Sequence, residues 1–270
     1  MGSVLTRELR ELVLEFAPSM DPKERFSNRV DDYVSYRPSY PAALVERLTA
    51  LADLRAGRVV ADVGSGTGIL TRLLLDTGAR VIGVEPNAAM RMAAERALSG
   101  EERFESRSAS AEATGLRDAS VDLVIAAQAF HWFEPVRARA EFGRILRPGG
   151  IVALVWNQRK DTPLNRDYEA MLERYAPDYR NVRERDRAAE PKIRAFFAPA
   201  LPSLATFPNE QRLDDSGLRG RLKSSSYAPT AESPHHEPMM KELAAIFGRY
   251  AEHGTVVIAY ETVLWHGRLI

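Results

Sequence analysis

The sequence has no cysteine, no net charge and no long apolar run, and each absence excludes a class of function. Without cysteine there can be no disulfide, no zinc–thiolate site and no cysteine nucleophile, which fits a reducing compartment. The 37 basic and 37 acidic residues cancel, so no overall field attracts nucleic acid or an anionic membrane. No apolar run approaches the roughly 20 residues of a membrane-spanning helix. We therefore expect a cytoplasmic protein with a small-molecule partner.

The first 20 residues are predicted to form a separate short helix. Their apolar residues recur at helical spacing, and prolines end the pattern. Charged residues, Arg7 and Glu8, stand where a secretory signal would be apolar. Gly2 and Thr6 match the N-myristoylation pattern, but that pattern is degenerate and an ordinary cytosolic start is favoured.

Apolar runs alternate with helical patterns through the middle of the chain. The runs lie at residues 58–63, 79–85, 121–127 and 151–156, and the intervening segments have a period near that of a helix. Such alternation is typical of successive βαβ units whose parallel strands are buried on both faces. It predicts an α/β, doubly wound, Rossmann-like fold.

The second half of the chain is less regular. Residues 158–202 mix charges of both signs and predict a helical insertion that caps the sheet, either as a solvated surface or as a lid over substrate. Residues 203–213 resemble a strand, 241–253 a helix and 255–267 a long final strand. These last elements are expected to complete the same sheet.

A glycine-rich turn, "VVADVGSGTG", follows the first buried run. Asp62 is followed by Gly64, Gly66 and Gly68, and glycine is needed where the backbone turns with positive φ or approaches a ligand closely. A dinucleotide fingerprint would place its third glycine one position later, at Ile69. The spacing therefore disfavours a nicotinamide-dependent oxidoreductase.

Glu85 ends the second run, in "VIGVEPN". A carboxylate at this strand end accepts hydrogen bonds from both hydroxyls of a ribose. Glu85 thus predicts a ribose-containing cofactor without choosing between cofactors.

Four motifs together, "VVADVGSGTG", "VIGVEPN", "SAEATGLRDASVDLVIAAQAFHWF" and "RILRPGG", resemble the class I S-adenosylmethionine-dependent methyltransferases. Within that family the chain is similar to the small-molecule branch, methyltransferase type 11, which includes trans-aconitate methyltransferase-like proteins. The resemblance implies a methyltransferase domain over residues 21–270, with a mostly parallel seven-stranded sheet and an antiparallel final strand. It implies methyl transfer from S-adenosyl-L-methionine, with S-adenosyl-L-homocysteine as product, but does not identify the acceptor.

The resemblance also implies a set of cofactor-binding residues. Asp62 would anchor the loop, Glu85 would hold the ribose, and residues 110–112 would face the adenine, with a serine where many relatives have an aspartate. The set comprises Asp62, Gly64, Ser65, Gly66, Gly68, Glu85, Pro86, Ser110, Ala111, Glu112 and Gln128.

Residues directly after the run at 121–127 are expected to face the acceptor, because open α/β sheets bind ligands at the carboxyl ends of their strands. His131 is the candidate base for a hydroxyl acceptor, whereas a carboxylate acceptor needs none. His131 and Trp132 are predicted either to contact the substrate or simply to pack between the fourth strand and its helix. We expect transfer to oxygen, on a carboxylate or a hydroxyl.

The segment "YVSYRPSYP" is predicted to close over the site. Tyr33, Tyr36 and Arg37 are the candidates, and Arg37 would pair with the carboxylate of the cofactor or with an anionic substrate. The alternative is an extended segment whose tyrosines pack on the sheet.

No metal is expected. The adjacent His235 and His236 point apart in a strand and seldom converge in a turn. A family member that binds the cofactor without transferring methyl is the second hypothesis for function, and the sequence makes no prediction of oligomeric state.

Overall fold

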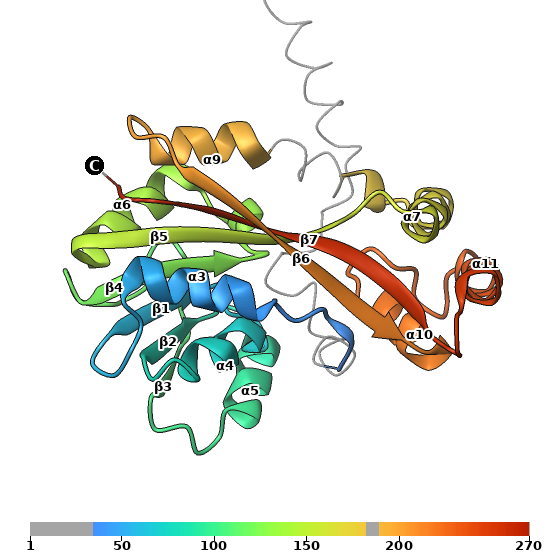
Figure 1. Ribbon diagram of the computed structural model, residues 1–270, viewed down its shortest axis with the longest axis horizontal. Coiled ribbons are helices and arrows are strands. Elements are labelled where there is room, and N and C mark those ends of the chain that lie inside the picture. The colour runs from blue at the N-terminus through green and yellow to red at the C-terminus, as the bar shows by residue number, and fades with distance from the viewer. Residues whose placement is uncertain (1–34, 182–188, 270) are drawn as a thin grey trace, which may run out of the picture.

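A seven-stranded sheet dominates the computed structural model, which describes residues 35–181 and 189–269 (Figure 1). The predicted helix of residues 1–20 and the candidate Tyr33 lie outside the described residues. The strand order is β3-β2-β1-β4-β5-β7-β6. The strands are β1 (Val59–Val63), β2 (Arg80–Val84), β3 (Phe104–Arg107), β4 (Val121–Ala127), β5 (Leu146–Arg159), β6 (Ser203–Leu213) and β7 (Val256–Gly267).

Strands β1 to β5 pair in parallel, and β7 runs antiparallel to both β5 and β6. The predicted mostly parallel sheet with an antiparallel final strand is therefore confirmed. The apolar run of β4 reflects burial on both faces, since Leu123 and Ile125 pack on one side and Val124 and Ala126 on the other.

Helices cover both faces of the sheet (Figure 1). They are α3 (Ala42–Ala52), α4 (Ile69–Leu75), α5 (Ala88–Ala97), α6 (Pro135–Ile145), α7 (Pro163–Tyr175), α9 (Ala189–Phe197), α10 (Asp215–Lys223) and α11 (His236–Tyr250), with a 3-10 turn at Phe130–Trp132. Leu44 and Leu48 of α3 pack with α4 on one face of β4, and Phe142 of α6 packs with Phe196 of α9 on the other. No helix of the described residues is long and apolar enough to cross a membrane.

A helical cap, defined here as α7, α10 and α11, packs on the far ends of β6 and β7 (Figure 1). Its core includes Met171, Leu218 and Leu243, which lie against Ile258 and Tyr260 of β7. Residues 158–202, predicted as one helical insertion, lie in two places. Helix α7 packs against α11 in the cap, while α9 packs against α6 on the face of the sheet opposite α3 and α4.

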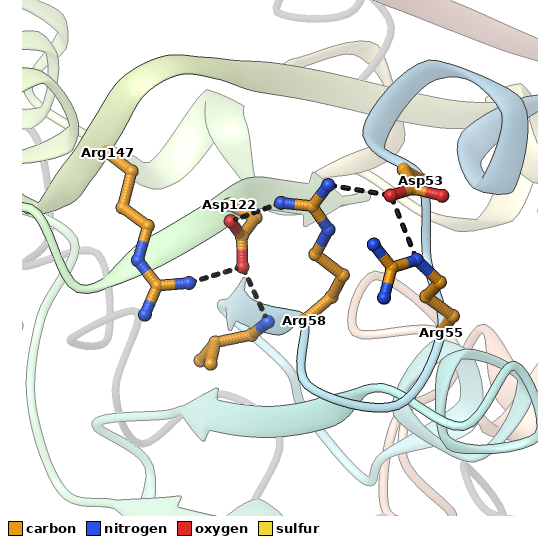
Figure 2. A network of polar contacts seen from close by, with 6 residues as sticks. Asp53, Arg55, Arg58, Asp122 and Arg147 are labelled. Carbon is orange, nitrogen blue, oxygen red and sulfur yellow. Dashed lines mark hydrogen bonds and ion pairs between the residues drawn. The ribbon is translucent and has the colours of Figure 1, made fainter.

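The amino end of β4 is fixed by a polar network (Figure 2). The buried Asp122 accepts hydrogen bonds from the backbone N–H of Val59 at 2.8 Å, from Arg147 at 2.7 Å and from Arg58 at 3.2 Å. Burial opposes ionisation of this carboxyl, but these donors lower the pKa of Asp122. Because ligands of such sheets bind at the carboxyl ends of the strands, we regard this network as structural.

Candidate cofactor and acceptor site

The glycine-rich loop joins the end of β1 to the start of α4. The N–H of Gly64 donates to the carbonyl of Val84 at 2.8 Å, which holds the loop against the end of β2. Gly64 has φ +70°, and a Cβ atom there would lie 2.5 Å from the Cβ of Ala129. Gly66 has φ +56°, but a Cβ there would meet nothing within 4 Å. A side chain at Gly64 would therefore collide with Ala129, whereas Gly66 borders open space.

Glu85 lies directly beside this loop, with only 8% of its surface exposed. Its Oε2 accepts from the N–H of Gly66 at 2.9 Å, and its Oε1 accepts from the N–H of Asn87 at 2.8 Å. Each carboxylate oxygen has two lone pairs, so each can accept one more hydrogen bond. Burial raises the pKa of Glu85, although these two N–H groups and Arg91 oppose the shift.

Asp62 is buried at the end of β1 and accepts a hydrogen bond from the hydroxyl of Thr71 at 2.6 Å. This contact ties β1 to α4 beneath the loop. Burial raises the pKa of Asp62 to about 6; Thr71 opposes the shift and the charge of Glu85 adds to it. Within the loop, the buried hydroxyl of Thr67 has no hydrogen-bond partner in the described structure. A spare donor, open space above Gly66 and a carboxylate with free lone pairs together fit a polar ligand that carries a ribose.

The other predicted cofactor residues lie at the ends of the neighbouring strands. Ser65 and Gly68 belong to the loop, and Pro86 follows Glu85 at the end of β2. Ser110 forms an isolated bridge with Ala113 after β3, and Ala111 is buried. Glu112 accepts from the N–H of Glu134 at 2.9 Å, so its carboxylate also supports the turn that starts α6.

Gln128 directly follows β4 and has φ +56°, a left-handed conformation that costs a non-glycine residue about 1 kcal/mol or more. Its N–H donates to the carbonyl of Val155 at 2.8 Å, and its side-chain amide donates to the carbonyl of Asn157 at 3.3 Å. The two bonds hold the turn at the carboxyl end of β4 against β5.

The aromatic segment after Gln128 divides between core and surface. Phe130 is buried and meets Trp156 and Phe196 edge to face. His131 and Trp132 are half-buried, with ring centroids 4.8 Å apart. Packing therefore accounts for Phe130, and the roles of His131 and Trp132 stay predictions.

Comparison with known proteins identifies the family. Residues 61–154 match the model of a methyltransferase domain. An uncharacterized methyltransferase of Schizosaccharomyces pombe is 30% identical over 224 residues, which are 82% of this chain and 86% of that protein. The chain belongs to the class I S-adenosylmethionine-dependent methyltransferases.

Two further relatives have the same family name. An uncharacterized methyltransferase of Mycobacterium tuberculosis is 40% identical over 136 residues, which are 50% of this chain and 53% of that protein, so the match spans about half the length of this relative. A solved methyltransferase structure from Anaeromyxobacter dehalogenans has a TM-score of 0.64 and 27% identity, and the match covers 87% of this chain and 99% of that one.

In this methyltransferase, residues 36–40 cross the sheet beside Gln128. The carbonyl of Ser39 accepts from Asn157 at 3.1 Å and from Asn209 at 2.9 Å, and the carbonyl of Tyr36 accepts from Gln211 at 2.9 Å. The guanidinium of Arg37 donates to the carbonyl of Ser224 after α10 at 2.9 Å. The segment thus joins the carboxyl end of the sheet to the cap.

Asn157 was not among the predicted site residues, although it contacts both Gln128 and Ser39. Nor were two arginines, Arg159 at the end of β5 and Arg221 of α10 in the cap. The available signal was an asparagine and an arginine that end an otherwise apolar run, in "IVALVWNQR".

Proposed function

We propose that this protein transfers the methyl group of S-adenosyl-L-methionine to an oxygen atom of a small molecule. The observation that carries the proposal is the position of Glu85. Its carboxylate is fixed by the N–H groups of Gly66 and Asn87 beside an open glycine-rich turn, and it keeps lone pairs for two ribose hydroxyls.

Different residues of the chain would bind the cofactor and the acceptor. When bound, the cofactor supplies a methyl group on a positively charged sulfur. Glu85 would accept hydrogen bonds from the ribose hydroxyls, with Pro86 beside it, and Ser110, Ala111 and Glu112 would lie against the adenine. Gln128, held by Val155 and Asn157, would border the reacting methyl.

Such a site promotes an in-line displacement by aligning the reacting atoms and excluding water from between them. Residues 36–40 and the cap would exclude water from the carboxyl end of β4. His131 would take the proton of a hydroxyl acceptor, whereas a carboxylate acceptor is already ionised.

Calorimetric titration with S-adenosyl-L-homocysteine tests the cofactor half of the proposal. We expect saturable binding with one site per chain, and absence of binding would refute the proposal. Incubation with S-adenosyl-L-methionine and a panel of carboxylic acids and phenols tests the transfer half. Formation of S-adenosyl-L-homocysteine with an acceptor supports transfer. Cofactor binding without turnover on any acceptor would favour a family member that does not transfer methyl.

A further inference from the structure

Two arginine side chains are buried together in the cap. Arg221 of α10 is 4% exposed, and the side chain of Arg159 at the end of β5 is 13% exposed. Tyr260 connects them, since it pairs with Arg159 across β5 and β7 and its hydroxyl accepts from Nε of Arg221 at 3.3 Å. Burial opposes the charge of Arg221, but Tyr260, Tyr227 and Tyr168 outweigh burial and raise the pKa of Arg221; the nearby charge of Arg159 acts against that rise. Two positively charged guanidinium groups thus lie close together in the interior of the protein.

The surrounding acids do not balance this charge. Arg159 pairs with Glu169 at 3.2 Å and donates to the hydroxyl of Tyr179 at 2.5 Å. Within the described part of the chain, Arg221 donates to two hydroxyls, those of Tyr260 and of Ser225 at 3.0 Å. No carboxylate of residues 35–181 or 189–269 forms an ion pair with Arg221. A guanidinium has five N–H donors, and these two bonds leave three of them without an acceptor among the described residues.

Burial of an uncompensated charge is expensive, and buried charges in proteins are normally paired with an opposite charge. Tyrosines rather than acids complete the cluster, because Tyr168 and Tyr179 lie under the guanidinium of Arg159. The hydroxyl of Tyr168 is itself buried, and no described residue forms a hydrogen bond with it. Hydroxyl and guanidinium donors around a site with excess positive charge are the groups that bind a carboxylate.

The cluster also lies within reach of the transfer site. Asn157, whose carbonyl holds the Gln128 side chain, and Arg159 are two residues apart on β5 and point to the same face. That spacing is about 7 Å along a strand. On the opposite side, Arg37 contacts Ser224, three residues after Arg221. A molecule of a few carbon atoms spans such a distance.

We propose that Arg159 and Arg221 form an anion subsite, and that the methyl acceptor is a small organic acid whose carboxylate binds there. The inference rests on the proposed function, because it names the acceptor class of that site. Arg221 is the main ligand, because its guanidinium pairs with no carboxylate of the described residues. The fork fits a carboxylate through two parallel hydrogen bonds.

Tyr227 responds to the charge of the same arginines. Burial opposes its ionisation, but the charges of Arg159, Arg221 and Arg37 outweigh burial and lower the pKa of Tyr227 to about 8. The groups that face this cluster are those three arginines, Glu169, Tyr168, Tyr179 and Tyr260. A bound carboxylate would offset the positive charge and raise the pKa of Tyr227 again.

The test is calorimetric titration of the full chain with succinate, glutarate and phenylacetate, and with their neutral amides. Each titration is made with and without S-adenosyl-L-homocysteine. We expect at least one acid to bind saturably while its amide does not, and Arg221→Gln to weaken that binding about tenfold or more. Arg219→Gln is the matched control, because Arg219 lies on the same helix but pairs with Asp215 near the surface. It should leave the affinity unchanged.

Failure of this inference is distinguishable from failure of the proposed function. Binding of S-adenosyl-L-homocysteine with no binding of any acid overturns the subsite alone, as does acid binding that persists in Arg221→Gln. Acid binding without cofactor binding supports the subsite and refutes the proposed function.

A second measurement follows the titration of Tyr227, so that it does not depend on the folding of Arg221→Gln. The tyrosinate absorbance that is lost in Tyr227→Phe should titrate near pH 8, and saturating acid should move that titration upward. A titration that the acids do not move would mean that Tyr227 itself is the counter-ion and that the subsite is wrong.

Discussion

Replacement of Glu85 by glutamine separates cofactor binding from folding. In the free protein the amide keeps one acceptor for the N–H groups of Gly66 and Asn87 and turns a donor toward the other. The substitution also removes a buried carboxyl group, whose pKa is raised by burial. The two effects oppose each other, and we expect the free energy of unfolding to change by only about 1 kcal/mol.

Cofactor binding should change far more. A ribose hydroxyl that loses a charged acceptor forfeits about 1.5 to 3 kcal/mol, which is about a 10- to 150-fold increase in the dissociation constant. Calorimetry with S-adenosyl-L-homocysteine measures it, with Glu95→Gln as control because Glu95 is 45% exposed on the neighbouring helix α5. A folded Glu85→Gln variant with unchanged affinity would refute the assignment of the ribose to Glu85.

The affinity should also depend on pH. Ribose hydroxyls bind the ionised carboxylate, and burial raises the pKa of Glu85 in the free protein. Affinity should therefore fall as pH decreases through that raised pKa, and the part of the pH dependence that belongs to Glu85 should be absent from Glu85→Gln. A purely structural glutamate would give parallel curves for the two proteins.

Two further predictions concern the stability of the fold. Asp122→Asn should lower the free energy of unfolding by about 2 kcal/mol near neutral pH, because three donors lose a charged acceptor. Since the folded pKa of Asp122 is depressed, its contribution is present above the unfolded pKa of about 4 and is lost as pH falls through the folded value, so urea curves of the two proteins should converge in acid. Gly64→Ala combines left-handed strain with a contact on Ala129 and should be destabilising by about 2 to 4 kcal/mol. Gly100→Ala has the same strain with open space around it and should be destabilising by only about 1 to 2 kcal/mol; equal losses in both glycine variants would contradict the contact argument.

The strands could be predicted from the sequence where burial on both faces produces a continuous apolar run. Strands β1, β2, β4 and β5 are apolar on both faces, so their runs stand out from the helical patterns between them. Strand β3 lies at the edge of the sheet and its sequence, "FESR", is mostly polar, so no run marks it. Helix α10 was not predicted because "DSGLRGRLK" contains two glycines and only two leucines.

The site was predictable where motif spacing fixes the backbone and not where distant segments meet. Glu85 and Gly66 touch because β1 and β2 are adjacent parallel strands, and the sequence contains that relation. Arg159 and Arg221 are 62 residues apart, as their numbers show, and they meet only through the pairing of β5 with β7 and the packing of α10 on Tyr260. No local pattern encodes that meeting.

The two halves of the proposed activity lie on different parts of the fold. The groups assigned to the cofactor lie at the ends of β1, β2 and β4, whereas those assigned to the acceptor lie in the cap and at the end of β5. Strand β5 is common to both, because Asn157 contacts Gln128 and Arg159 enters the cap. Substitutions in α7 and α10 would therefore change which acceptor binds while the turn around Glu85 stays intact. The fixed spacing from Asn157 to Arg159 along β5 would set the distance between the anchored carboxylate of the acceptor and the atom that receives the methyl group.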